Sequence, residues 1–225
     1  MMVKMKLCYV FGLVAAVNAH IQMSWPPAFR SKFNPYVIDV DYDMTAPLHA
    51  DGGNYPCKGY HSLMDTPQGK TVVNWRPGQT YNITLAGSAT HLGGSCQVSM
   101  SFDRGQTWKV LHSYIGKCPL SPTWQFMLPY DTPNGSALFA WSWFNKVGNR
   151  EMYMNCAHVA IDRGSAVPSG PQADSITERP PMLAANIGNG CSTIEGYDLA
   201  FPQPGPALST LSENTAPPVG SCGRI

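Results

Sequence analysis

The chain has 225 residues with a formal net charge of +1, and charged residues make up only 13% of it. A balance so close to neutral leaves no electrostatic case for binding nucleic acid or an anionic membrane. Glycine (21 residues) and proline (20 residues) are abundant beside aromatic and β-branched residues. This composition favours one mostly β domain with long loops.

The first nineteen residues have the features of a secretory signal peptide. Lys4 and Lys6 form a basic start, an apolar run follows over residues 7–17, and small residues stand at Val17 and Ala19. The apolar run is too short to span a bilayer. We therefore expect cleavage after Ala19, a secreted and extracellular mature protein, and no membrane partner.

Cleavage after Ala19 would make His20 the first residue of the mature chain. Its free α-amino group titrates near ~8 and its imidazole near ~6.5, so a metal can displace the remaining protons at neutral pH. Copper(II) prefers such nitrogen-rich planar ligand sets. Any residue can follow a cleavage site, however, so the alternative is that His20 has no ligand role.

Seven cysteines are present, and Cys8 leaves with the signal peptide. Six cysteines in a secreted chain predict disulfides, and their spacing lacks the close pairs of a zinc site. Closeness in sequence favours pairing Cys96 with Cys118, and a shared place in the tail favours pairing Cys191 with Cys222. Cys57 and Cys156 are then left over. These expected pairs are Cys96–Cys118, Cys191–Cys222 and Cys57–Cys156.

Strand-like alternation begins after residue 70, behind a Pro-, Gly- and Tyr-rich stretch over residues 28–68 that we expect to be a long loop region. Trp141 and Trp143 fall on one face of a strand and are expected in the core. Residues 182–205 carry apolar and cysteine anchors and are expected to pack against that core. The predicted strands cover residues 21–25, 71–75, 80–91, 95–103, 107–114, 124–129, 137–145 and 149–161.

His91 is the strongest histidine candidate for a second ligand. In a strand over 80–91, Ala89 and His91 share a face, and Gly93 and Gly94 then let the backbone pass close to a flat substrate. His49 and His61 lie in the long loop region, where either could be a further ligand, although surface or hydrogen-bonded histidines are commoner. His112 is expected on the solvent face of its strand.

Residues 149–161 form a strand with two chemically different faces. Glu151, Tyr153 and Asn155 share one face, whereas the other carries methionine and cysteine side chains. With His20 and His91, the polar face could build a mononuclear metal site with Tyr153 axial and Glu151 beside the ligands. The alternative is an ordinary strand whose polar face meets solvent.

These residues resemble fungal lytic polysaccharide monooxygenases, specifically auxiliary activity family 11. The resemblance rests on His20, on GSATHLGGSCQ (87–97) and on AWSWFNKVGNREMYMNCA (140–157), with ANIGNGC and EGYDLAFPQPG in the tail. It covers nearly the whole mature chain. Leu92 departs from the pattern, because we expect glycine after the metal-binding histidine, and it puts substrate preference in question more than copper binding.

The resemblance implies an immunoglobulin-like or fibronectin-like β-sandwich with long loops and short helices. It implies one copper ion held by His20 and His91 in a histidine brace, with Tyr153 axial, Ala89 crowding the open axial side and Glu151 next to the ligands. The implied activity is oxidative cleavage of insoluble chitin, with C1 attack, using an electron donor such as ascorbate and O2 or H2O2. We expect a monomer.

Two other interpretations remain open. A secreted histidine-brace protein could bind copper without cleaving polysaccharide, and a conventional hydrolase would need an acidic pair that no motif supplies. Asn82 and Asn134 begin possible glycosylation sequons. The expected organisation is a signal peptide at 1–19, a copper monooxygenase domain at 20–205 and a Ser/Pro/Thr-rich tail at 206–225 tied by Cys222.

Overall fold

The computed structural model describes residues 21–164 and 175–222, so the expected signal peptide and His20 lie outside the described residues. The described residues are mostly β, with two short 3-10 helices, and none of the helices has the length and apolar character needed to cross a bilayer. The strands and helices are β1 (Ile21–Trp25), η1 (Cys57–Asp65), η2 (Pro67–Gly69), β2 (Val73–Trp75), β3 (Thr80–Gly87), β4 (Gly94–Ser101), β5 (Lys109–Ile115), β6 (Thr123–Met127), β7 (Gly135–Asn145), β8 (Met152–Ile161), β9 (Cys191–Ser192), β10 (Asp198–Leu199), β11 (Leu208–Thr210), β12 (Thr215–Ala216) and β13 (Val219–Gly220).

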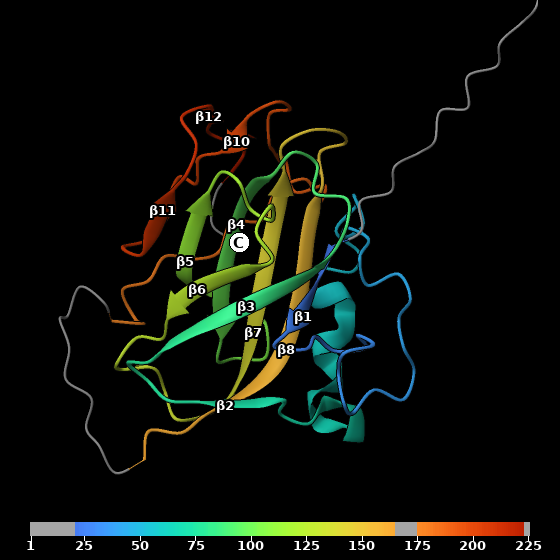
Figure 1. The fold of residues 1–225 in the computed structure, drawn as a ribbon, viewed down its shortest axis with the longest axis vertical. Helices are drawn as coiled ribbons and strands as arrows, with labels where there is room; N and C mark the ends of the chain where they lie inside the picture. Colours follow the sequence, from blue (N-terminus) through green and yellow to red (C-terminus); the bar gives the residue numbers. More distant parts are fainter. Residues whose placement is uncertain (1–20, 165–174, 223–225) are drawn as a thin grey trace, which may run out of the picture.

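Two sheets form a sandwich, as expected. The larger has six strands in the order β11-β5-β4-β7-β8-β2, and the smaller has three in the order β1-β3-β6. In Figure 1, β3 and β6 cross in front of the larger sheet. Antiparallel β4, β7 and β8 are long and pair along nearly their full length, so they form a rigid centre to which the end loops are attached.

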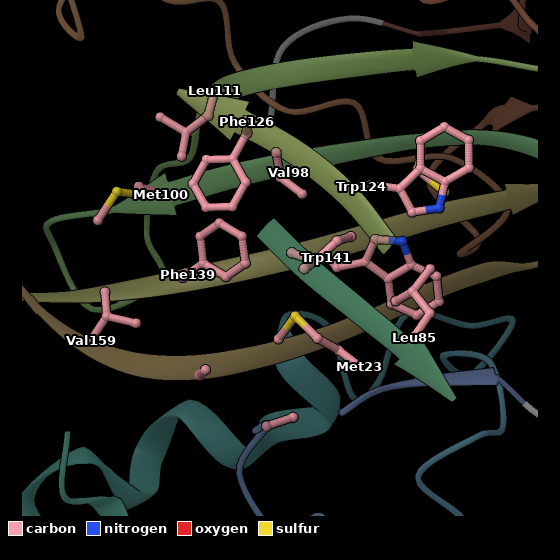
Figure 2. Close-up of a cluster of buried hydrophobic side chains, with 14 of the residues drawn as sticks. Met23, Leu85, Val98, Met100, Leu111, Trp124, Phe126, Phe139, Trp141 and Val159 are labelled. Carbon is pink, nitrogen blue, oxygen red and sulfur yellow. The ribbon is translucent and has the colours of Figure 1, made fainter. Parts of the chain in front are cut away.

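The core between the sheets follows directly from strand alternation. Trp141 and Trp143 are fully buried, which confirms the sequence expectation. Figure 2 shows Met23 and Leu85 from the smaller sheet beside Trp141 of the larger one. Because residues i and i+2 of a strand share a face, one strand, β7, delivers both indoles to the same layer.

A second apolar layer covers the opposite face of the larger sheet. Met152, Met154 and Cys156 pack there against side chains of residues 182–201, so the expected packing of that segment is confirmed. The residues of β8 between them face the smaller sheet. Tyr153 is 1% exposed and Asn155 is buried too, so the alternative of a solvent-facing polar strand is wrong: the second sheet covers that face.

Three disulfides join Cys57 to Cys156, Cys96 to Cys118 and Cys191 to Cys222, all as expected. The first connects η1 to β8 across 99 residues of sequence. It therefore pins the region expected to be one long loop, which contains η1 and η2 between its irregular stretches.

The segment after residue 206 adds a strand to the larger sheet, because β11 pairs in parallel with β5. This corrects the expectation for His112. Its Nε2 lies 2.9 Å from Ser209 Oγ and its ring stacks on Tyr114 at 4.3 Å, so β11 covers a side chain expected to face solvent. Burial, together with the positive charge of Arg179, lowers the pKa of His112 to about 4.

Candidate metal centre

Two loops meet at one end of the sandwich, at the top of Figure 1: the β3–β4 loop and the β7–β8 loop. The first contains His91, but β3 ends at Gly87 and not at residue 91 as expected. Ala89 and His91 therefore lie in a turn and not in a strand. His91 (φ 48°) and Leu92 (φ 57°) both have left-handed backbone, followed by Gly93 (φ 102°).

The turn holds the His91 ring in one defined orientation. Nδ1 donates to the Val147 carbonyl at 2.7 Å, since a carbonyl oxygen can only accept. A neutral imidazole with a proton on Nδ1 presents a lone pair at Nε2. This Nε2 is buried and has no hydrogen-bond partner among residues 21–164 and 175–222. A buried acceptor of this kind, with its other nitrogen fixed by a backbone carbonyl, is typical of a metal-binding histidine.

Tyr153 and Glu151 are brought to the same end of the sandwich. The Tyr153 hydroxyl donates to Glu151 Oε2 at 2.7 Å. The Trp143 ring lies 4.5 Å from the Tyr153 ring and 5.8 Å from the His91 ring, so Trp143 packs against both. Burial raises the pKa of Tyr153, and its hydrogen bond to Glu151 raises it further, so the phenol stays protonated at neutral pH.

The other histidines of the described residues do not join His91. His49 is exposed, and His61 lies near Gly105, in the turn after β4 at the opposite end of that strand. His158 is held between the Gly69 carbonyl and another polar side chain. Within the described ranges, no three His, Cys, Asp or Glu side chains cluster as metal ligands.

His91 is the described histidine at this end of the sandwich, and the other expected ligand, His20, lies outside the described residues. Ile21, the first described residue, pairs with Gly87 at the end of β3, from which the loop to His91 continues. The unpaired nitrogen of His91 is a donor that suits copper. Nε2 of His91 thus fits one of the nitrogen ligands expected for a copper ion.

The surface around His91 carries exposed apolar side chains that sequence reasoning did not single out, apart from Leu92. Leu92 is 72% exposed. Leu120, also exposed, lies next to Gly93, with its Cδ1 3.6 Å from the position of a Cβ there. These groups give the His91 turn an apolar, outward-facing side.

A pocket of about 390 Å³ lies beside the end of β3. Gln22 of β1 and Ser88, which follows β3, form part of its wall, and Tyr42 and Phe33 come from the long loop region. Tyr42 is 91% exposed although its neighbours Asp41 and Asp43 are tied to Lys58. The length of the loop region was the one sequence signal for a binding surface here.

No family model matches the chain. It is 50% identical over 196 residues to "AA11 family lytic polysaccharide monooxygenase A" of Aspergillus fumigatus, covering 85% of this chain and 86% of that one. It is 36% identical over 227 residues to "AA11 family lytic polysaccharide monooxygenase B" of the same species, but spans only 51% of that relative's length. Among solved structures, the crystal structure of HiLPMO9B has a TM-score of 0.44 and 14% identity, covering 57% of this chain and 67% of that one.

Proposed function

Because the chain belongs to the AA11 family of lytic polysaccharide monooxygenases and is therefore a copper-dependent oxidoreductase, we propose that it cleaves the β-1,4 bonds of chitin by oxidising C1. The observation that carries the assignment of the site is the buried, unpaired Nε2 of His91, whose ring is fixed through Nδ1. We assign one copper ion to the α-amino group and ring of His20 and to Nε2 of His91.

When bound, copper supplies one-electron exchange with a reductant such as ascorbate and activation of O2 or H2O2. The chain supplies the surroundings. Tyr153 would present a protonated phenol, held by its hydrogen bond to Glu151, towards the bound copper. Ala89 would leave only a methyl group beside the copper, and the carboxylate of Glu151 would hold or transfer a proton at the site.

The reaction inserts one oxygen atom into the C1–H bond of a sugar unit. With O2, two electrons and two protons are also consumed and the second oxygen atom leaves as water; with H2O2, the second oxygen leaves as water directly. The hydroxylated carbon then expels the O4 of the neighbouring unit, which takes up the proton. A lactone remains, which water converts to an aldonic acid.

The substrate side of the proposal rests on the outer surface of the site. Leu92 and Leu120 are exposed beside His91, and Tyr42 stands beside the neighbouring pocket. Apolar and aromatic groups of this kind suit the C–H faces of pyranose rings. An exposed surface also suits an insoluble polymer whose chains cannot enter a deep cleft. Chitin is chosen because of the resemblance of residues 87–97 and 140–157 to chitin-active enzymes.

We further propose that the protein is a secreted, extracellular monomer, produced by cleavage after Ala19. Three disulfides suit an oxidising compartment. Cleavage also frees the amine that the copper site requires. The domain boundaries at residues 20 and 206 stay as predicted from the sequence.

The test is mass spectrometry of soluble products from β-chitin incubated with the processed, copper-loaded protein and ascorbate. We expect aldonic-acid chito-oligosaccharides that require both reductant and copper. Controls are the reaction without ascorbate, the His91→Ala variant, and a protein with one extra residue before His20, whose amine has become an amide. Only the first protein with reductant should give products.

Tight copper binding without any oxidised product from chitin would reject chitin as the substrate. Products from cellulose alone would redirect the proposal to another β-1,4 polymer, and C4-oxidised ends would reject C1 attack. A His91→Ala protein that still binds copper as tightly as the parent would reject the ligand assignment.

A further inference from the structure

The β7–β8 loop, residues 146–151, sets the orientation of His91, and contacts run in both directions between them. The Val147 carbonyl accepts from His91 Nδ1 at 2.7 Å, and the Val147 amide donates to the His91 carbonyl at 3.3 Å. The same Val147 carbonyl also accepts from Asn145 Nδ2 at 3.0 Å. The position of this one carbonyl therefore determines where the imidazole lies.

Arg150 binds the loop from within. Its guanidinium donates to the carbonyls of Asn145, of Lys146 (3.5 Å) and of Gly148 (3.0 Å). Its Nε and one terminal nitrogen also donate to Thr193 Oγ1 at 3.2 and 3.1 Å. Three carbonyl oxygens converge on one half-buried cation, and their dipoles would repel one another without it.

A second segment, residues 193–198, supports the loop from outside. Glu195 Oε1 accepts from the Gly148 amide at 3.1 Å, and Lys146 pairs with the buried Asp198 at 3.0 Å. The Gly196 amide donates to the Lys146 carbonyl at 2.8 Å. The loop is therefore held by Arg150 on one side and by this segment on the other, and we infer that its geometry depends on the Arg150 side chain.

We propose that Arg150 is a positioning residue for the copper ligand His91, acting through Asn145 and the Val147 carbonyl. The inference rests on the proposed function only in taking His91 as the ligand. Arg150 has no role in contacting substrate or copper; it fixes the acceptor that keeps the proton on Nδ1 and aims Nε2. Loss of a hydrogen-bond partner of a metal-binding histidine lowers metal affinity about 10–100-fold.

Arg150→Lys is the variant to test, because lysine keeps the charge but offers one nitrogen in place of a planar fork. The matched control is Arg163→Lys. Arg163 follows β8 at its far end and donates in a similar way to two backbone carbonyls, at 2.6 and 3.0 Å. Both variants should lose thermal stability, but only Arg150→Lys should alter the copper centre.

Copper(II) titration of each apoprotein and electron paramagnetic resonance of each loaded protein are the two metal readouts. We expect Arg150→Lys to raise the copper Kd about 10–100-fold and to change the hyperfine splitting, while Arg163→Lys keeps both parental values. A copper-free readout is the ¹⁵N shift of the imidazole nitrogens. The parent should show His91 protonated at Nδ1 alone, and Arg150→Lys should show a mixture of tautomers.

The outcomes separate the two claims. A parent protein that does not bind copper tightly contradicts the proposed function. If the parent binds copper and Arg150→Lys keeps its Kd, its spectrum and the single tautomer, Arg150 has no positioning role. Should Arg150→Lys fail to fold, Thr193→Val removes one acceptor of the guanidinium with little change in volume. The same comparison then applies to Thr193→Val, and unchanged values in that folded variant overturn the proposal.

Discussion

A single methyl group added at Gly148 should disturb the metal centre by pressing on the His91 ring, without replacing any proposed ligand. An ideal Cβ at this position lies 3.2 Å from His91 Nδ1 and 3.4 Å from its Cε1. The contact with Nδ1 is tighter than most real Cβ contacts, so we expect the imidazole to move by a few tenths of an ångström. That movement pulls Nδ1 away from the Val147 carbonyl and turns Nε2 from its direction.

The same substitution also has a backbone cost. Gly148 has φ +103°, a conformation that L side chains rarely adopt. We expect Gly148→Ala to lose about 1–3 kcal/mol of unfolding free energy. In a domain of this size, each kcal/mol lowers Tm by roughly 2–4 °C. The displaced ring should weaken copper binding about tenfold, within the range known for changes around metal-binding histidines.

Gly135→Ala separates the two effects. Gly135 has φ +115°, but nothing lies within 4 Å of its ideal Cβ, and it begins β7 at the end away from His91. Calorimetric Tm and copper titration should show similar destabilisation in both variants and weaker copper binding only in Gly148→Ala. Equal copper affinity in Gly148→Ala and the parent would refute the assigned position of the His91 ring.

Three further predictions concern stability and substrate binding. Replacing Cys57 and Cys156 by serine should lower the unfolding free energy, measured by chemical denaturation, by about 4–5 kcal/mol. Opening the Cys96–Cys118 bridge, of sequence separation 22, should cost less, because a shorter closed loop restricts the unfolded chain less. An equal loss from both bridges would contradict this. Tyr42→Ala should weaken adsorption to β-chitin about two- to tenfold in a pull-down isotherm. Phe102 follows β4 at the end away from the His91 turn, so Phe102→Ala should leave adsorption unchanged. Unchanged adsorption of Tyr42→Ala would exclude this ring from the binding surface. The folded-state pKa of His112 is lowered to about 4 from 6.5, so the unfolded state takes up the proton first and stability falls as pH drops through that window. Between pH 7 and pH 4, His112→Gln should therefore lose about 1–2 kcal/mol less unfolding free energy than the parent, after allowing for partial solvent screening. Denaturation at each pH measures this difference, and the same pH dependence in both proteins would contradict it.

Features that depend on strand alternation were predicted well from the sequence. The two faces of residues 149–161 and the burial of Trp141 and Trp143 follow from a period of two, which needs no knowledge of partners. What covers each face is a different question. Alternation placed Tyr153 on the same strand face as Glu151 and Asn155. Tyr153 is shielded from solvent because the smaller sheet covers that face, and the alternation of one strand does not predict which sheet packs on it.

The residues of the candidate site were named from the sequence, but the local geometry around them differs from the expectation. His91 was expected at a strand end, yet consecutive left-handed residues, including the non-glycine Leu92, form a turn that local propensity does not favour. His112 is covered by a three-residue strand from far along the chain, too short to show a period. The role of Arg150 depends on convergent carbonyls, which no side-chain pattern reveals.

The edges of the larger sheet have a consequence for biosynthesis. Its outermost strands, β2 and β11, come from residues 73–75 and 208–210, and both pair in parallel with strands distant in sequence. A nascent chain can assemble the antiparallel centre early, but the sheet cannot be completed until β11 has left the ribosome. Such long-range pairing folds slowly. We therefore expect a partly assembled form with an open sheet edge to persist during folding, when that edge is exposed to pairing with other chains.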